Sequence, residues 1–275
     1  MLDLTLDAVR DLAEDVAGNE GRDETPFGTY VFTPSDPGVA LALHVERSVF
    51  EESFGSTADD MREEFAPYAA ASLFFCVVDH CRRLPVGAVR IIVPNPVGLK
   101  SLDDIEVVWG QSVHEVLARN ALALDETRTW DIATLAVAPG YRNRVVSQAL
   151  HQAIGVGTMN CGIDWYASVL DIRALRLLQA QLSRVFRLYE GVEPAMYAGS
   201  ESVPVWSDLV EYRERLRSAE PALYETIFGG RNLEAVVSLF DGEQVAAVAR
   251  DLVRAERAGA ERAGTEPQAM SGRAA

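Results

Sequence analysis

The sequence predicts a mixed α/β fold, in which one sheet of parallel and antiparallel strands is flanked by helices. Two observations lead to this prediction. Short apolar runs that end at proline, glycine or aspartate alternate along residues 29–209 with segments of helical periodicity. In addition, 275 residues with 48% hydrophobic and 24% charged side chains are enough for a large core. Strands and helices in this order pack as layers around a sheet.

The elements follow from local pattern. Each predicted strand is a short run rich in β-branched or aromatic residues: 29–33, 72–78, 86–93, 130–138 and 163–170, with weaker candidates at 187–189, 195–197 and 204–209. Each predicted helix has apolar residues three and four positions apart: 2–16, 39–54, 102–124, 145–156, 172–182, 211–217, 221–228 and 233–257. The strands at 72–78 and 86–93 form the clearest hairpin, because only a short polar link separates them and Pro94 stops the second.

The order of these elements predicts the domain organisation. We divide the chain into an N-terminal helical extension at 1–25, an α/β domain at 26–210, a C-terminal helical extension at 211–258 and a tail at 259–275. The tail has too few apolar residues to pack, so we expect it to be disordered.

Charge excludes some classes of partner. The chain has 25 basic and 41 acidic residues, for a net charge of −16. Most of such a surface repels phosphates, so we expect neither general nucleic-acid binding nor adhesion to anionic lipid. Residues 140–187 differ, because six arginines there accompany only two aspartates. This arginine-rich stretch is suited to a local anion site.

Other sequence features bear on location and on metals. No apolar run approaches the roughly 20 residues of a membrane-spanning helix, and Asp3, Asp7 and Asp11 lie where an export signal has basic residues. We therefore expect a cytoplasmic protein without a membrane segment. Three cysteines without C-x-x-C spacing and four scattered histidines predict neither a disulfide framework nor a metal site. The oligomeric state is left open.

The most informative segment for chemistry is the strand, turn and helix at 130–156. A loop that opens a helix presents backbone N–H groups without helical partners, and the helix dipole adds partial positive charge. Such a unit can hold the phosphate of a pantetheine-linked cofactor. The same pattern is also common as a plain structural crossover.

Residues 137–150, VAPGYRNRVVSQAL, resemble the acetyl-CoA motif of the GCN5-related N-acetyltransferases (GNATs). The family pattern is [QR]-x-x-G-x-[GA], and Arg142 fills its first position. Val145 and Ser147 replace the glycines that let the backbone approach a pyrophosphate closely. The resemblance implies a GNAT-like fold with extra N- and C-terminal helices. The cofactor contacts that it implies in this loop and helix are Arg142, Arg144, Val145, Val146 and Ser147.

A longer resemblance, over about residues 45–209, points to one branch of that superfamily, the acyl-homoserine lactone synthases and the related N-acyl amino acid synthases. It rests on RSVFEE at 47–52, PVGAVRIIVP at 85–94, WDIATLAV at 130–137 and SVPVWSDL at 202–209. In W-E-x-S-R-F, the family's glutamate becomes Asp131 and its arginine becomes Thr134. Both aspartates of an acidic family motif are replaced, by Ala66 and Ala69. Synthesis of homoserine lactone signals is therefore not expected.

The resemblance also implies roles for single residues. An amine would attack a thioester where two strands splay apart, and backbone N–H groups of Leu135 and Val137 would bind the oxyanion. A carboxylate, directly or through water, would accept the amine proton, and a tyrosine would protonate the thiolate. The implied catalytic side chains are Asp131, Thr134, Tyr141 and Tyr166. The implied substrate contacts are Phe50, Arg90, Trp130, Trp165 and Ser168. A structural role is the alternative for each, such as an ion pair for Arg90.

The function predicted by the resemblance is N-acyl transfer from a thioester to a small-molecule amine, without a tightly bound cofactor. The donor would be acyl-CoA or the phosphopantetheine thioester of an acyl carrier protein. An acyl carrier protein brings a single phosphate and needs no cradle for a pyrophosphate. The loss of the two glycines therefore fits a carrier-protein donor better than CoA. Two alternatives remain open. One is an aminoacyl-tRNA donor, favoured by the arginines. The other is a non-catalytic binding module, favoured by Thr134, Val145, Ser147 and Leu178, the last of which lies where many acetyltransferases have a tyrosine.

Overall fold

The computed structural model describes residues 4–18, 25–142 and 144–265. Its helices are α1 (Leu6–Ala17), α2 (Val39–Phe54), α3 (Ala58–Phe65), α4 (Lys100–Val107), α5 (Val113–Arg119), α6 (Arg144–Cys161), α7 (Ile172–Gln181), α8 (Leu209–Ala219), α9 (Pro221–Ile227) and α10 (Gly242–Thr265). Its strands are β1 (Phe27–Phe32), β2 (Ser72–Asp79), β3 (Leu84–Ile92), β4 (Thr129–Val137), β5 (Trp165–Asp171), β6 (Arg187–Leu188), β7 (Ala195–Tyr197), β8 (Ser200–Asp208) and β9 (Val236–Ser238). Three short 3₁₀ turns, Ala66–Ala71, Glu126–Arg128 and Pro139–Tyr141, precede β2, β4 and α6.

The strands of the described part form one mixed sheet in the order β6-β8-β5-β4-β3-β2-β1-β9, with β7 paired to β8. The run from β1 to β4 is antiparallel, and so is the pairing of β5 with β8. Only the β4–β5 and β1–β9 pairs are parallel. The mixed α/β fold predicted from the sequence is therefore confirmed.

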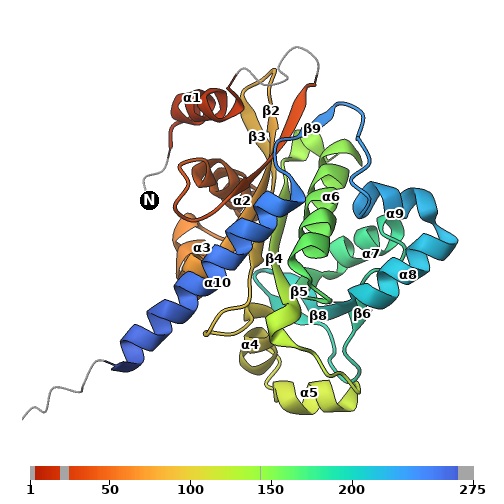
Figure 1. Ribbon diagram of the computed structural model, residues 1–275. Helices are drawn as coiled ribbons and strands as arrows, with labels where there is room; N and C mark the ends of the chain where they lie inside the picture. Colours follow the sequence, from red (N-terminus) through yellow and green to blue (C-terminus); the bar gives the residue numbers. More distant parts are fainter. Residues whose placement is uncertain (1–3, 19–24, 143, 266–275) are drawn as a thin grey trace, which may run out of the picture.

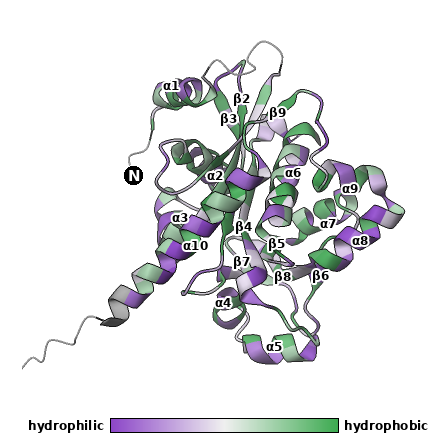
Figure 2. Cartoon of the chain, viewed as in Figure 1, coloured by the Kyte–Doolittle hydropathy of each residue, from purple (hydrophilic) through white to green (hydrophobic). Residues whose placement is uncertain are grey.

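Helices cover both faces of the sheet (Figure 1). Along β2, Leu73, Phe75 and Val77 pack into a core with α6, whereas Phe74 and Cys76 pack into a second core with α2. This alternation follows from the two-residue period of a strand, and burial on both faces explains why β2 is apolar from Leu73 to Val78. Figure 2 shows the same layering, with apolar central strands between helices whose outer faces are polar. In the described part of the chain, no helix is long and apolar enough to cross a membrane.

Three elements differ from their predicted form. The helix expected at 102–124 is two short helices, α4 and α5, with Gly110 between them at a φ of 61°. The predicted helix at 233–257 begins only at Gly242, because residues 236–238 pair in parallel with β1 as β9. Residues 259–265, which we expected to be disordered, continue α10; the rest of that predicted tail lies outside the described residues.

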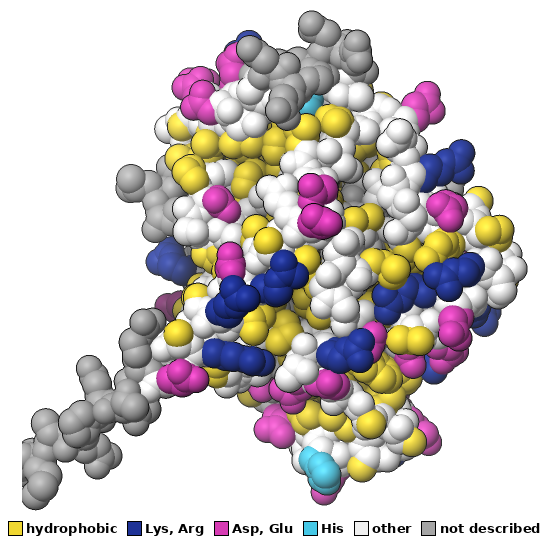
Figure 3. All heavy atoms as spheres, in the orientation of Figure 1, with side chains coloured by type: hydrophobic (Ala, Val, Ile, Leu, Met, Phe, Trp, Pro, Cys, Tyr) yellow, Lys and Arg dark blue, Asp and Glu magenta, His cyan; other side chains and the backbone are white. Residues whose placement is uncertain are grey.

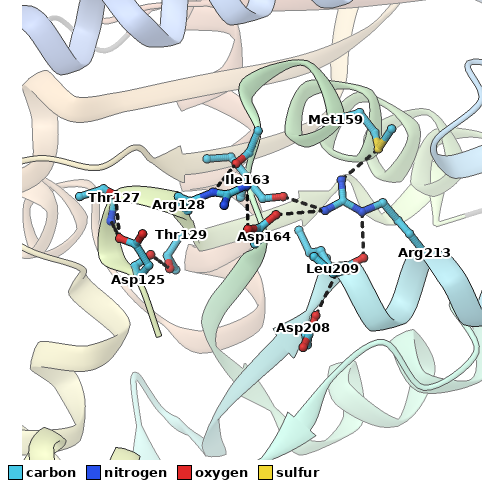
Figure 4. Close-up of polar contacts among 12 residues, drawn as sticks. Asp125, Thr127, Arg128, Thr129, Met159, Ile163, Asp164, Asp208, Leu209 and Arg213 are labelled. Carbon is cyan, nitrogen blue, oxygen red and sulfur yellow. Dashed lines mark hydrogen bonds and ion pairs between the residues drawn. The ribbon is translucent and has the colours of Figure 1, made fainter. Parts of the chain in front are cut away.

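A polar clamp fixes the start of the two central parallel strands (Figure 4). The Asp164 carboxylate, just before β5, forms an ion pair of 2.8 Å with Arg128, just before β4, and one of 3.6 Å with Arg213 of α8. Arg213 also donates to the carbonyl oxygens of Leu209 and Ile163. The clamp therefore holds β4, β5 and α8 together at one end of the sheet.

Candidate active site

The two central strands separate after this closed end. The β4–β5 ladder covers only Thr129–Asp131 opposite Trp165–Ala167. Beyond it the Ser168 hydroxyl donates a hydrogen bond of 2.7 Å to the Ile132 carbonyl, bridging the strands by a side chain. The β3–β4 register shifts at the same level, between Arg90 and Ile91. Such a bulge bends a strand, so it accounts for β4 turning away from β5.

The divergence leaves backbone groups of β4 facing a gap. Ala138 donates its N–H to the Val86 carbonyl at 3.0 Å, on the β3 side. The N–H groups of successive residues point to opposite edges of a strand. Because the Ala138 N–H points toward β3, those of Leu135 and Val137 point away from it. On that side no residue of β5 pairs with them, because the β4–β5 ladder ends at Asp131.

A cavity of about 360 Å³ fills the space between the separated strands. Its strand walls are Ile132, Ala133, Thr134, Leu135 and Val137 of β4 and Ser168, Val169, Leu170 and Asp171 of β5. Four helices also line it: α2 with Phe50 and Phe54, α3 with Glu64 and Phe65, α7 with Leu177 and Leu178, and α6 with Ser147 and His151. The Asp171 carboxylate accepts from the N–H groups of Arg173 and Ala174, so α7 starts directly at the cavity.

Arg142 and Ser147 bring polar groups to one side of this cavity. The Arg142 guanidinium donates to the Ser53 hydroxyl at 3.2 Å and to the Val137 carbonyl at 3.3 Å, and its side chain remains exposed. Ser147 lies on the first turn of α6 and also lines the cavity. Val146 is instead buried in the core, next to Gly87. The side chain of Arg144 lies outside the described part of the structure.

A band of basic side chains lies away from the cavity. Figure 3 shows it across the face that carries α10 and α8. Exposed arginines on these two helices include Arg217, Arg250 and Arg254. Neither helix lines the cavity of about 360 Å³, so Arg142 alone brings a described basic side chain to its wall.

Another part of the cavity wall is acidic and aromatic. Glu64 and Tyr197 line it, and behind them lies Lys100, the single lysine of the chain. The Lys100 ammonium lies 2.8 Å from Glu64, 2.7 Å from Asp104 and 2.5 Å from the Tyr197 hydroxyl. Burial alone lowers the pKa of Lys100, but Asp104 and Glu64 raise it above its usual value. The two carboxylates and one ammonium give this cluster a net negative charge.

A buried ion pair lies under the cavity wall. Arg90 donates to both oxygens of Glu46, at 2.9 and 2.5 Å, and its guanidinium stacks on Phe65 at 4.1 Å. The Thr134 hydroxyl donates to the same carboxylate at 2.5 Å. Arg90 and Glu46 line a neighbouring cavity, whereas Thr134 lines the central one. The geometry gives Arg90 the structural ion pair that the sequence left as an alternative.

Several solved structures resemble this fold, although their sequences differ widely from this one. No family model matches the chain, and no curated protein matches it significantly. FeeM, an N-acyl amino acid synthase from uncultured soil microbes, is similar over 70% of this chain and 95% of its own, at 15% identity and a TM-score of 0.52. BjaI with MTA, a CoA-dependent acyl-homoserine lactone synthase, is similar over 82% of this chain and 99% of its own, at 13% identity and a TM-score of 0.54. The chain has a GNAT-like fold. At these identities the likeness concerns the fold alone.

Within the GNAT-like fold, the residues predicted from the sequence separate into two groups. The central cavity brings together Phe50, Thr134, Leu135, Val137, Arg142, Ser147 and Ser168. The others lie elsewhere. The Tyr141 hydroxyl donates to Asp79 at 2.7 Å, Trp130 is buried in the α6 core, and Trp165 packs on Trp206. Tyr166 lines a smaller adjoining cavity, and Val145 packs against the core.

Asp131 also lies away from the cavity. Its side chain is fully buried, and its carboxylate accepts from the backbone N–H and the hydroxyl of Ser101, both at 2.6 Å. These bonds tie β4 to the first turn of α4. Burial raises its pKa to about 6, although the Ser101 bonds oppose the shift. Its role as general base stays a prediction, and the contacts favour a structural role.

The pH dependence of stability tests the raised pKa of Asp131, and turnover tests its role. A carboxyl whose pKa is raised on folding binds its proton more tightly in the folded state, so stability falls as the pH rises from about 4 to about 6. We expect the wild type to lose up to about 3 kcal/mol over this range relative to Asp131→Asn, measured by urea unfolding. This linkage holds whatever the role of Asp131, so turnover separates the two roles: a structural carboxylate predicts that Asp131→Asn keeps turnover within about threefold, whereas a general base predicts a roughly 10²- to 10⁴-fold loss.

The cavity residues that sequence reasoning missed include Glu64, Tyr197 and His151. Glu64 is the retained first residue of the acidic motif that is altered at Ala66 and Ala69, Tyr197 lies in a segment with only a weak strand pattern, and His151 belongs to no metal-binding pattern. Of these, Glu64 carried a usable signal, because it is the retained first position of that motif. Nothing in the sequence brings Tyr197 and His151 to the same cavity, since sheet topology decides it.

Proposed function

We propose that this protein is an N-acyltransferase that moves an acyl group from a phosphopantetheine thioester, of CoA or of an acyl carrier protein, to a small-molecule amine. The observation that carries the proposal is the gap between β4 and β5, where the Leu135 and Val137 N–H groups face a cavity. The similar BjaI has a structure with SAM and isopentyl-CoA, with a TM-score of 0.50 over 82% of this chain. We transfer the CoA-linked donor to this chain, and the small-molecule amine acceptor is part of our proposal.

The proposed reaction forms one bond and breaks one. The amine nitrogen attacks the thioester carbonyl carbon, and the carbonyl oxygen gains negative charge that the Leu135 and Val137 N–H groups stabilise. The carbon–sulfur bond then breaks, the amine loses a proton, and the thiolate takes one up. The products are an amide and a free thiol. Backbone donors of this kind need no particular side chain, which suits the loss of the usual family residues.

Two parts of the cavity wall suit the two substrates. Arg142 and Ser147, at the start of α6, suit the phosphate of the donor. The acceptor would enter beside Glu64, whose side chain is 31% exposed and belongs to the net negative cluster around Lys100. A carboxylate there attracts a protonated amine and can receive its proton.

The donor side gives a direct binding prediction. Arg142→Ala combined with Arg144→Ala should weaken donor binding about tenfold or more, because a charge-assisted contact to phosphate is lost. Isothermal titration with acyl-CoA and with an acylated carrier protein measures the effect. Arg254→Ala is the matched control, because Arg254 is an exposed arginine outside the cavity.

The outcomes separate the donors. A loss for CoA only, for the carrier only or for both identifies which donor uses these arginines. Equal binding of both donors to the double variant and the wild type would contradict the assignment. Wild-type binding without any amide formation across a panel of amines would favour a non-catalytic module.

A further inference from the structure

His151 is a polar group in an apolar place. It lies on α6, is 7% exposed, and lines both the central cavity and an adjoining cavity of about 40 Å³. The two cavities share Ile132, Leu135, Leu170 and Leu178 as well, so they adjoin at the separated strands. The remaining walls of the small cavity are apolar apart from Tyr166 and Tyr212.

The two tyrosines already have partners, whereas the Nε2 atom of His151 has none in the described structure. Tyr212 donates to the Leu182 carbonyl at 2.7 Å, and Tyr166 bonds the Thr158 side chain. Within the described structure, His151 Nε2 is buried without a hydrogen-bond partner. An unsatisfied buried polar atom destabilises the folded state, whereas an apolar side chain would not. The arrangement therefore favours a ligand that supplies the missing hydrogen bond.

The protonation state limits what this ligand can be. Burial lowers the pKa of His151 to about 4, so the imidazole is neutral at physiological pH. A neutral imidazole has one N–H donor and one acceptor nitrogen. It can bond a hydroxyl or a carbonyl oxygen, but it offers no charge to an anion. Its low pKa also makes it a weak base.

We propose that His151 hydrogen-bonds an oxygen substituent on the acyl chain, so that the preferred donor carries a hydroxyl- or oxo-substituted acyl group rather than a plain alkyl one. This inference rests on the proposed function. An acyl carbonyl bound at Leu135 places the chain beside the shared apolar wall. The small cavity has room for roughly one small group, which matches an oxygen substituent better than a long chain.

The test compares donors that differ only in this oxygen. Octanoyl-CoA and derivatives with a hydroxyl or oxo group at successive carbons are titrated against the wild type by calorimetry. We expect one substituent position to bind about three- to tenfold more tightly than octanoyl-CoA. His151→Leu should abolish this preference, and His151→Gln, whose amide reaches a similar position, should restore part of it. Transfer assays on the same series should show the same ranking.

Controls separate this inference from the proposed function. Ile154→Val changes the volume of the same small cavity without changing its polarity, so it should affect all donors alike. Equal binding of plain and oxygenated donors to the wild type would overturn the inference and leave the proposed function standing. So would an equal loss of turnover for every donor in His151→Leu, because that indicates a different role. If no thioester binds the wild type, the proposed function fails first.

Discussion

Replacing Leu135 by proline should lower acyl transfer by about 10²- to 10³-fold while the sheet stays folded. Proline removes the backbone N–H, which in Leu135 faces the cavity and not β3. The loss therefore falls on the proposed oxyanion contact and spares the β3–β4 ladder. Proline is tolerated in strands where the N–H has no ladder partner, and Leu135 occupies such a position inside a central strand.

Two variants control for this change. Leu135→Ala removes the same side chain and keeps the N–H, so most activity should remain. Ala136→Pro removes an N–H that faces β3, so the protein should unfold. Thermal melts verify folding, and steady-state transfer to a competent amine measures turnover. A folded Leu135→Pro variant with activity within threefold of the wild type would show that this N–H takes no part in the reaction.

The fold was predictable because its signals are local. The largely apolar run at 72–78, the polar link and the second run at 86–93 specify a hairpin at the centre of the sheet. The parallel β9 gave no such signal: it has three residues and pairs with β1 from the far end of the chain. Its pairing depends on how α9 and α10 return across the sheet, which local periodicity does not encode.

Residues of the site could be predicted only where the order of strands and helices alone brings them to the cavity. Phe50, Leu135 and Ser168 reach the cavity because the order of strands and helices places them there. Asp131 does not, because the bulge between Arg90 and Ile91 and the approach of Ser101 turn its carboxylate toward α4. A motif match specifies residue types along one strand, whereas the partner that satisfies a buried carboxylate comes from another element.

Replacing Arg90 by methionine should cost about 3–5 kcal/mol of stability, the largest stability effect that we expect from a single side chain here. Methionine keeps an apolar stem beside Phe65 and Phe74 but leaves the Glu46 carboxylate buried without its cation. The side chains of the pair are 6% and 2% exposed, so water cannot replace the lost partner. Urea unfolding measures the loss.

The double variant Glu46→Gln with Arg90→Met distinguishes an ion pair from a substrate contact. Glutamine removes the buried charge and can still accept from Thr134, so the double variant should recover much of the stability that Arg90→Met loses. If Arg90 instead recognised the acceptor, Arg90→Met would raise the KM for the amine with little change in stability, and the second substitution would restore nothing. Because the guanidinium already has both Glu46 oxygens as partners, we expect the first result.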